Sequence, residues 1–193
     1  MPGTVRPVVD ELDGLLAYLD QQRYVLKTAA YGLSDAQARM AASTSTLTIG
    51  GLIKHCALTE AHWCGDIPGS PPPPVAVFPG QDAYRDGFIL HEDETLAGVL
   101  ATWAEIASHT ETVVRAAGLD KPVPVPRDAP WFPADVEAWS VRWVMLHLIA
   151  ETARHAGHAD LVREGIDGAT AYPLMAAAEQ WNVPWMPAWK PAG

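Results

Sequence analysis

The segment WSVRWVMLHLIAETARHAGHADLVREGIDG, residues 139–168, decides the fold of this chain and carries its most informative polar residues. At about 100° per residue, many of its side chains fall within about 60° of one direction, as in a helix that packs on a core. Glu151 and His155 fall inside this stripe, whereas Arg142 and Arg154 lie outside it. An ionised carboxylate facing a core costs free energy unless a partner compensates its charge. The other members of the stripe are Val141, Val144, Met145, Leu148, Thr152, Ala159 and Val162.

Glu151 and His155 are one helical turn apart, so both side chains can reach the same point. One interpretation is a divalent metal, because ligands at this spacing build metal sites inside helical bundles. The alternatives are a buried Glu–His hydrogen bond and an ion pair between Glu151 and an arginine of another helix. None of the 13 Lys and Arg residues lies on the stripe. Periodicity leaves the three interpretations open and directs attention to a third ligand.

Three further histidines are candidates for that ligand. His55, in the helical segment GLIKHCALTEAHW, flanks the apolar stripe of its helix at about 100° from the centre. A histidine in a flanking position is most often solvated, but a place near mid-helix would allow His55 to face the pair. His147 and His158 lie at the edge of the later stripe and are either boundary residues or additional members of the site.

Four long helical patterns and no strand pattern run through the chain, which predicts an all-α four-helix bundle. The expected helices cover residues 8–30, 48–63, 92–118 and 140–164. An acidic turn is expected to begin the third helix, at the positive end of its dipole. Ser140 is expected to cap the last helix, and Gly165 and Gly168 to end it. Long proline-containing connections around the third helix permit an order other than simple up-down-up-down.

The chain divides into a bundle at residues 1–170 and an extension rich in proline and tryptophan at residues 171–193. Trp181, Trp185 and Trp189 recur at four-residue intervals, but two intervening prolines prevent a continuous helix. We expect the extension to pack as an extended tail on the bundle or to contribute to a homodimer interface. A lid over a pocket is the remaining alternative.

Composition limits the chemistry and the partners. The chain has 193 residues, a net charge of −10 and 49% hydrophobic residues, as expected for a globular protein. Because no stretch is rich in Lys and Arg, we expect neither nucleic acid nor an anionic membrane as a partner. No segment has the pattern of a signal peptide or a membrane-spanning helix. Cys56 and Cys64 would lie about 12 Å apart on one helix, too far for a disulfide, so we expect reduced thiols and a cytoplasmic protein.

The segments at residues 51–63 and 139–170 resemble the DinB-like superfamily, and in particular its branch with mycothiol-dependent maleylpyruvate isomerase and mycothiol S-transferase. The run ETARHAGHADLVRE is typical of mostly actinobacterial members of that branch. The resemblance implies a four-helix bundle in up-down-down-up order. It also implies a metal site with one histidine from the second helix and a Glu-x3-His pair from the last, which here are His55, Glu151 and His155.

The resemblance also implies a function. Three protein ligands leave one position of a zinc ion open, as in catalytic sites. Zinc, or alternatively nickel, would then activate mycothiol or a similar low-molecular-weight thiol for attack on an electrophilic small molecule. The isomerase carries a further C-terminal domain that has no counterpart here, so a thiol S-transferase is expected rather than an isomerase. Metal-dependent hydrolysis and non-catalytic binding of a metal or small ligand are the alternatives.

Polar residues of the second connection are candidates for the rim of a pocket, namely Asp82, Tyr84, Arg85 and Asp86. A turn that merely orders the loop would explain these residues equally well. Arg142 lies opposite the stripe of its helix, so we expect it to pair at the surface or between helices rather than to bind substrate.

Overall fold

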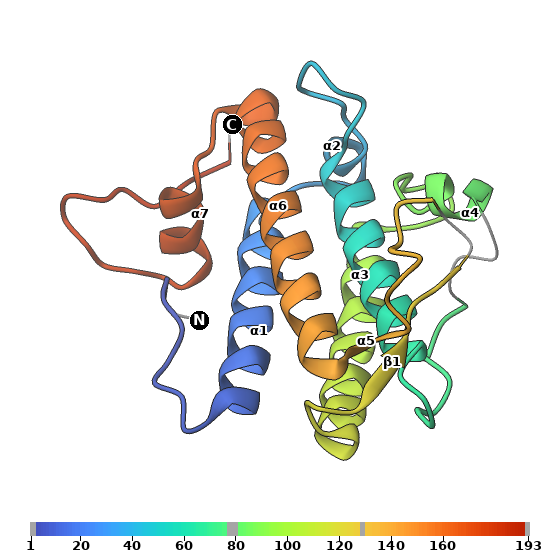
Figure 1. Ribbon diagram of the computed structural model, residues 1–193. Coiled ribbons are helices and arrows are strands. Elements are labelled where there is room, and N and C mark those ends of the chain that lie inside the picture. Colours follow the sequence, from blue (N-terminus) through green and yellow to red (C-terminus); the bar gives the residue numbers. More distant parts are fainter. Residues whose placement is uncertain (1–2, 77–80, 128–129, 192–193) are drawn as a thin grey trace.

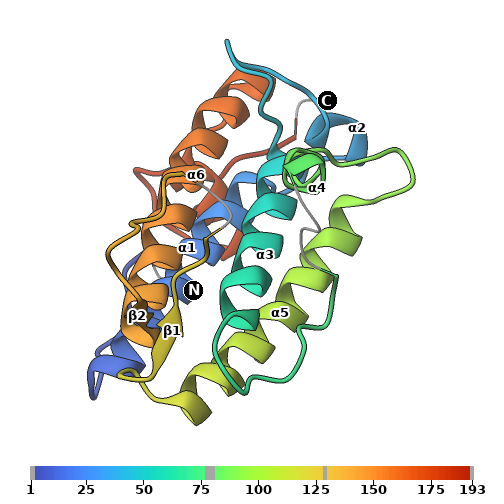
Figure 2. The ribbon, with the colours of Figure 1, turned by 45° about the vertical axis from the view of Figure 1, so that its right-hand side comes forward.

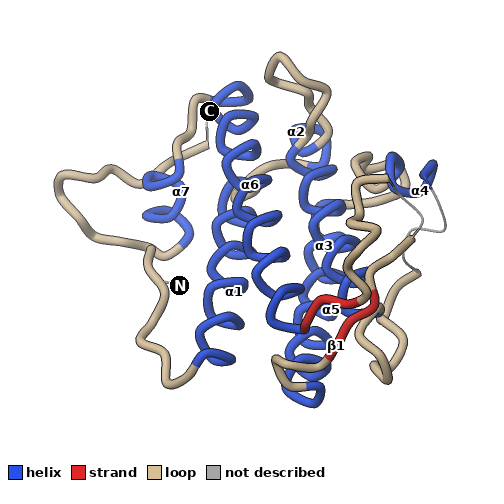
Figure 3. Tube along the Cα trace, viewed as in Figure 1, coloured by secondary structure: helices blue, strands red, loops and turns tan. Residues whose placement is uncertain are grey.

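The computed structural model describes residues 3–76, 81–127 and 130–191, without the side chains of residues 81–83. Among the described elements, four long helices dominate (Figure 1): α1 (Glu11–Ala29), α3 (Ile49–Gly65), α5 (Leu96–Ala117) and α6 (Val141–Asp167). Shorter helices lie in the connections and near the C-terminus, namely α2 (Asp35–Ala38), α4 (Gln81–Asp86) and α7 (Ala171–Ala178). Two short strands (Figure 3) are β1 (Pro122–Pro124) and β2 (Ala138–Ser140). None of the described helices is long and apolar enough to cross a membrane.

The long helices pack as a bundle, with α1 against α6, α6 against α3 and α3 against α5 (Figure 2). In Figure 1, α1 and α6 run toward the top, and α3 and α5 run toward the bottom. The connection between α3 and α5 therefore returns along the length of the bundle. Two clusters of buried apolar side chains fill the interior, one around Ile53, Trp103 and Ile106 and the other around Leu19 and Met145. The prediction of an all-α bundle is confirmed.

The ends of α6 follow from its local sequence. Ser140 caps the start as predicted, because its hydroxyl accepts a hydrogen bond from the backbone N–H of Trp143. The helix ends where Gly168 adopts the left-handed conformation, with φ of 72°. The prediction that Gly165 helps to end the helix is wrong, since it lies inside α6. A Cβ at Gly165 would stand 1.9 Å from the carbonyl oxygen of Ala42, so close packing against the loop requires this glycine.

The starts of two other helices differ from the prediction. α5 begins after Thr95, whose hydroxyl caps the first turn, and not at the acidic residues 92–94. The carboxylate of Glu94 instead pairs with Lys54 of α3 at 2.9 Å, which ties the preceding loop to the bundle. α1 likewise begins after its capping residue Asp10, later than predicted. In both helices a capping side chain sets the boundary.

Two short strands accompany the helices, although no strand pattern stands out in the sequence. β1 and β2 pair in antiparallel order, with Val123 opposite Trp139. Each strand has three residues, too few to show an alternating pattern in the sequence. Both ends of β1 are prolines, which are uncommon in strands because they lack a backbone N–H, and this further obscures the strand in the sequence. Because Val123 is buried, the strand pair closes the bundle beside the start of α6.

The C-terminal extension begins with α7, which contacts α1, and continues without regular structure. The helical start differs from the extended tail that the sequence suggests. Trp189 packs edge-on against Tyr31 and beneath the guanidinium of Arg163, 4.8 Å from the ring centroid. Trp185, in contrast, is 77% exposed. The extension thus contacts the bundle through both α7 and Trp189, and the division of the chain at residue 170 stays a prediction.

Candidate metal centre

His55, Glu151 and His155 come together between α3 and α6 and are called here the His–Glu–His cluster. A possible ligand atom of each residue lies within 4.8 Å of those of the other two. Nε2 of His55 is 3.4 Å from Oε1 of Glu151, and Nε2 of His155 is 3.1 Å from the same oxygen. Ligand atoms around tetrahedral zinc lie about 3.3 Å apart, given bonds of about 2.0 Å. These two separations therefore fit a zinc ion.

The electrostatics of the cluster also fit a cation. Burial lowers the pKa of His55, which favours its neutral imidazole. Hydrogen bonds from His155 and from His55 lower the pKa of Glu151, so its carboxylate is ionised. In the described part of the chain, Glu151 pairs with these histidines and with no arginine or lysine. Two imidazoles and one carboxylate without a cationic partner match the donor set of a divalent metal.

His55 is only 1% exposed, more deeply buried than its flanking position on the helix suggests. The ring of Phe88 stacks on it with centroids 3.7 Å apart, and Tyr84 meets it edge-on at 5.5 Å. Both aromatic residues belong to the connection between α3 and α5, which folds back over this side of α3. The periodicity of α3 does not indicate that a distant connection covers His55, so the stacking of Phe88 on His55 could not be predicted from the sequence.

The rim candidates occupy different positions. Tyr84 reaches the His–Glu–His cluster, whereas Asp86 pairs with a histidine of its own loop at 2.7 Å. Arg85 is exposed, and the side chain of Asp82 lies outside the described part of the structure. Arg142 pairs with acidic residues of α1 and of the segment after α5, both at 2.6 Å, which confirms its expected pairing between helices.

The two edge histidines of α6 differ in their relation to the cluster. Nδ1 of His158 lies 3.4 Å from Nδ1 of His155, so His158 can fix the orientation of that ring. His147 is half-buried and stacks on Trp143, with centroids 5.1 Å apart. Among the described residues, neither joins the three that bring ligand atoms together.

Glu60 of α3 is a second buried carboxylate and provides a comparison with Glu151. The guanidinium of Arg23 donates two hydrogen bonds to Glu60, of 2.6 and 3.0 Å. The indole of Trp103 and the hydroxyl of Thr110 donate two more, of 3.0 and 2.6 Å. Protein groups therefore both neutralise and satisfy Glu60, whereas Glu151 receives only imidazoles. The sequence gives no sign of the Arg23–Glu60 pair, because its members lie on different helices.

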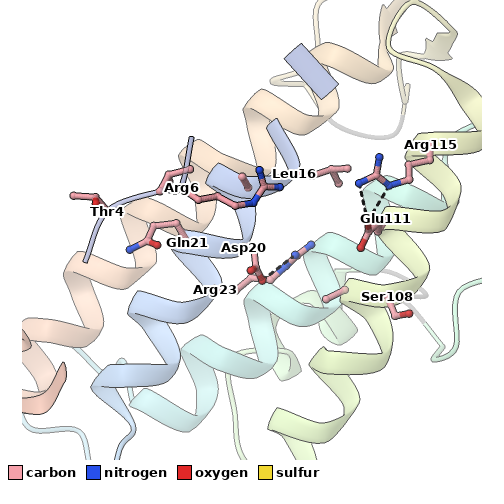
Figure 4. Close-up of a pocket in the computed structure, with 12 residues that line it drawn as sticks. Thr4, Arg6, Leu16, Asp20, Gln21, Arg23, Ser108, Glu111 and Arg115 are labelled. Carbon is pink, nitrogen blue, oxygen red and sulfur yellow. Dashed lines mark hydrogen bonds and ion pairs between the residues drawn. The ribbon is translucent and has the colours of Figure 1, made fainter. Parts of the chain in front are cut away.

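A groove of about 390 Å³ opens between α1 and α5 (Figure 4). Its polar lining includes Arg6, Asp20, Glu111 and Arg115, and no member of the His–Glu–His cluster. The charges in this groove are already paired, since Glu111 binds Arg115 at 2.8 Å and Arg6 binds Asp13 of α1. The groove and the candidate metal centre are therefore separate features, between different pairs of helices.

Comparisons with known proteins agree with the fold and give the family of the chain. The crystal structure of a conserved protein from Enterococcus faecalis is similar, with a TM-score of 0.58 and 12% identity over 84% of this chain and 100% of that one. At this identity the likeness shows the fold alone. No curated protein matches the chain significantly. The helical bundle with its His–Glu–His cluster is DinB-like in class. More narrowly, the model of the mycothiol-S-transferase family matches residues 14–168, so the chain belongs to that family.

Proposed function

We propose that this protein is a metal-dependent transferase that joins mycothiol, or a similar low-molecular-weight thiol, to an electrophilic carbon. The family match over residues 14–168 supports the thiol. The metal is supported by one observation above all, the ionised carboxylate of Glu151 that meets two imidazoles and no cationic side chain among the described residues. Zinc is the ion we expect, with nickel as the alternative, because both accept imidazole and carboxylate ligands.

Each residue of the site has a distinct role in this proposal. Glu151 would supply the negative charge of the ligand set, and His55 and His155 would supply neutral nitrogens. His158 would fix the ring of His155, while Phe88 limits rotation of the His55 ring by stacking on it. With three protein ligands, the bound ion would keep one position open for a thiol and would lower the pKa of that thiol.

The protein's own cysteines are unsuited to be the attacking nucleophile. Cys56 and Cys64 are buried, and burial raises the pKa of both thiols, that of Cys64 to about 12. The thiol of Cys64 also donates a hydrogen bond to Thr110 inside the bundle. Since the thiolate is the nucleophilic form, a buried protonated cysteine reacts poorly. This supports a thiol that arrives as a cosubstrate.

Thiol-dependent consumption of an electrophile tests the proposal. We expect zinc-loaded protein to accelerate the reaction of mycothiol with iodoacetamide or with benzylideneacetone, a conjugated ketone. His55→Ala should reduce this acceleration at least about 100-fold, since a ligand is lost. His62→Ala, on the same helix but outside the cluster, is the matched control and should retain the activity. A wild-type protein that accelerates neither reaction would contradict the proposed function.

A further inference from the structure

The groove between α1 and α5 has the size of a small-molecule site. Its volume of about 390 Å³ lies within the range of about 300–1,000 Å³ that such sites occupy. Side chains from residues 16–23 of α1 and 107–115 of α5 line it, together with residues 4–6 of the N-terminal segment (Figure 4). No member of the His–Glu–His cluster is among them, so a ligand in the groove would bind independently of the metal.

Arg23, which lines the groove and is 5% exposed, has one nitrogen without a hydrogen-bond acceptor. Its Nε and Nη2 donate to Glu60, at 3.0 and 2.6 Å. Its Nη1 is 3.8 Å from Oδ1 of Asp20, too far for a hydrogen bond, and donates to no other described residue. Because Nη1 carries two N–H groups, the buried guanidinium has unused donors beside the carboxylate of Asp20.

Gln21 is a second buried polar residue of the groove with an unused group. The residue is 6% exposed, and its Oε1 accepts no hydrogen bond from any described residue. A buried carbonyl oxygen without a donor costs free energy, and most such atoms in proteins have a partner. The terminal torsion of a glutamine side chain is soft, so the amide can turn Oε1 toward a ligand in the groove. A ligand that donates a hydrogen bond would satisfy it.

The ionised groups of the groove argue against a charged ligand. Each guanidinium that lines it already has a carboxylate partner, in the pairs Arg6–Asp13, Arg115–Glu111 and Arg23–Glu60. An anion would meet the carboxylates of Asp20 and Glu111, and a cation would meet the guanidinium groups. Either would lose its hydration without gaining an unpaired counter-charge of its own. The groove therefore suits an uncharged ligand that can both donate and accept hydrogen bonds.

We propose that the groove binds an uncharged polyhydroxylated ring, of which a hexose is the simplest example. A hydroxyl group is both a donor and an acceptor. One hydroxyl of the ring would accept a hydrogen bond from Nη1 of Arg23 and donate one to Asp20, and so bridge the 3.8 Å between them. A neighbouring hydroxyl would donate to Oε1 of Gln21. This binding is independent of the proposed transferase activity and of the metal.

The rest of the lining suits the other surfaces of such a ring. The side chains of Leu16, Ala17 and Ala107 are apolar and offer a contact surface for its C–H groups. Thr4 and Ser108 are exposed, and their hydroxyls make no hydrogen bond to a described side chain, so they are available to the outer hydroxyls of the ring. A mostly apolar wall with a few placed polar groups is the usual composition of a small-molecule site.

Titration calorimetry of the whole protein with D-glucose, D-mannose and D-galactose tests the proposal. At least one of the three hexoses should bind, with the same Kd for zinc-loaded and chelator-treated protein. The corresponding uronate, which carries a carboxylate, should bind at least about fivefold more weakly, because it meets the acidic side chains of the groove. Cyclohexanol has the ring but only one hydroxyl and should not bind measurably.

Two adjacent glutamines of α1 provide matched variants, since Gln21 lines the groove and Gln22 does not. Gln21→Leu should raise the Kd of the hexose about five- to tenfold, because one hydrogen bond to the ligand is lost. It should not lower the Tm, because the variant removes a buried oxygen that has no donor. Gln22→Leu should leave the Kd unchanged. Asp20→Ala, at an exposed position, should raise the Kd at least about tenfold.

Several outcomes would overturn the site. These are a wild type that binds none of the three hexoses, a Kd unchanged by both Gln21→Leu and Asp20→Ala, and equal losses of affinity in Gln21→Leu and Gln22→Leu. Circular dichroism of each variant would establish that it is folded. Because the groove contains no ligand of the candidate metal centre, any of these results would leave the proposed transferase activity standing.

Discussion

Glu60 and Glu151 both point into the helical bundle, but their carboxylates have different partners: a guanidinium for Glu60 and two imidazoles for Glu151. Glu60 on α3 is 1% exposed and is neutralised by the guanidinium of Arg23. Glu151 on α6 has imidazole partners, and no described arginine or lysine pairs with it. Glu151 is partly exposed and its partners can stay neutral, so its negative charge is still available to a cation, whereas the charge of Glu60 is already neutralised. This contrast is the physical basis of the proposed metal centre.

Removal of the charge at Glu151 should change the Tm of the metal-free protein and of the zinc-loaded protein by different amounts. In the presence of a chelator, Glu151→Gln should lower the Tm modestly, because the hydrogen bonds that His55 and His155 donate to an ionised carboxylate are weakened. On addition of zinc, the wild type should gain Tm and the variant should not, because only the wild type binds the ion tightly. Differential scanning calorimetry with and without chelator checks this. A variant that gains as much as the wild type would refute the role of Glu151 as a ligand.

Loss of the cation at Glu60 should be far more damaging to the fold. Arg23→Met leaves Glu60 buried without its counter-charge, which should lower the free energy of unfolding by about 3–5 kcal/mol. Arg115→Met, at an exposed pair with Glu111, is the control and should change it by less than about 1 kcal/mol. Urea unfolding measures both. Equal changes in the free energy of unfolding for the two variants would mean that burial of the Arg23–Glu60 pair does not increase its contribution to stability.

Two glycines of α6 should respond to alanine in opposite directions. Gly165→Ala would push a methyl group into the carbonyl oxygen of Ala42, so we expect a loss of about 1–3 kcal/mol in the free energy of unfolding. Gly157→Ala meets no atom within 4 Å and should stabilise the helix by about 0.5–1 kcal/mol. Thermal or urea unfolding distinguishes the two. A stabilised Gly165→Ala protein would show that the loop at Ala42 does not pack as described.

Mild acid should destabilise the metal-free protein. Burial lowers the pKa of His55 below the ordinary 6.5, so the unfolded chain takes up a proton first as the pH falls. Stability should therefore decline from about pH 6.5 downward, and half-buried His147 adds an effect of the same sign. Protonation of Glu151, whose pKa is lowered, reduces stability only below about pH 4.5 and so does not contribute between pH 6.5 and pH 5.5.

The Tm of chelator-treated protein between about pH 8 and about pH 5.5 measures this dependence. We expect a smaller decline for His55→Asn, which cannot be protonated at this position. A Tm that is flat over this range, or an identical decline in the variant, would be inconsistent with a neutral buried His55.

Features set within one helix could be predicted from the sequence, and features set between distant segments could not. Glu151 and His155 share a helix, so periodicity alone placed them on the same inward stripe. The partnership with His55 depends on how α3 faces α6, and it was expected only through the family resemblance. The stacking of Phe88 on His55 and the pair of Arg23 with Glu60 arise from contacts between separate segments, which leave no local pattern.

The metal content of the purified protein is the most direct test of the central claim. Mass spectrometry of the native protein, or elemental analysis, should find about one zinc or nickel ion per wild-type chain, as one three-ligand site requires. His155→Ala should lose the ion, and His62→Ala should retain it. An ion that remains in His155→Ala, or a wild type that neither contains a metal nor is stabilised by added zinc, would show that the His–Glu–His cluster is only a buried hydrogen-bonded group.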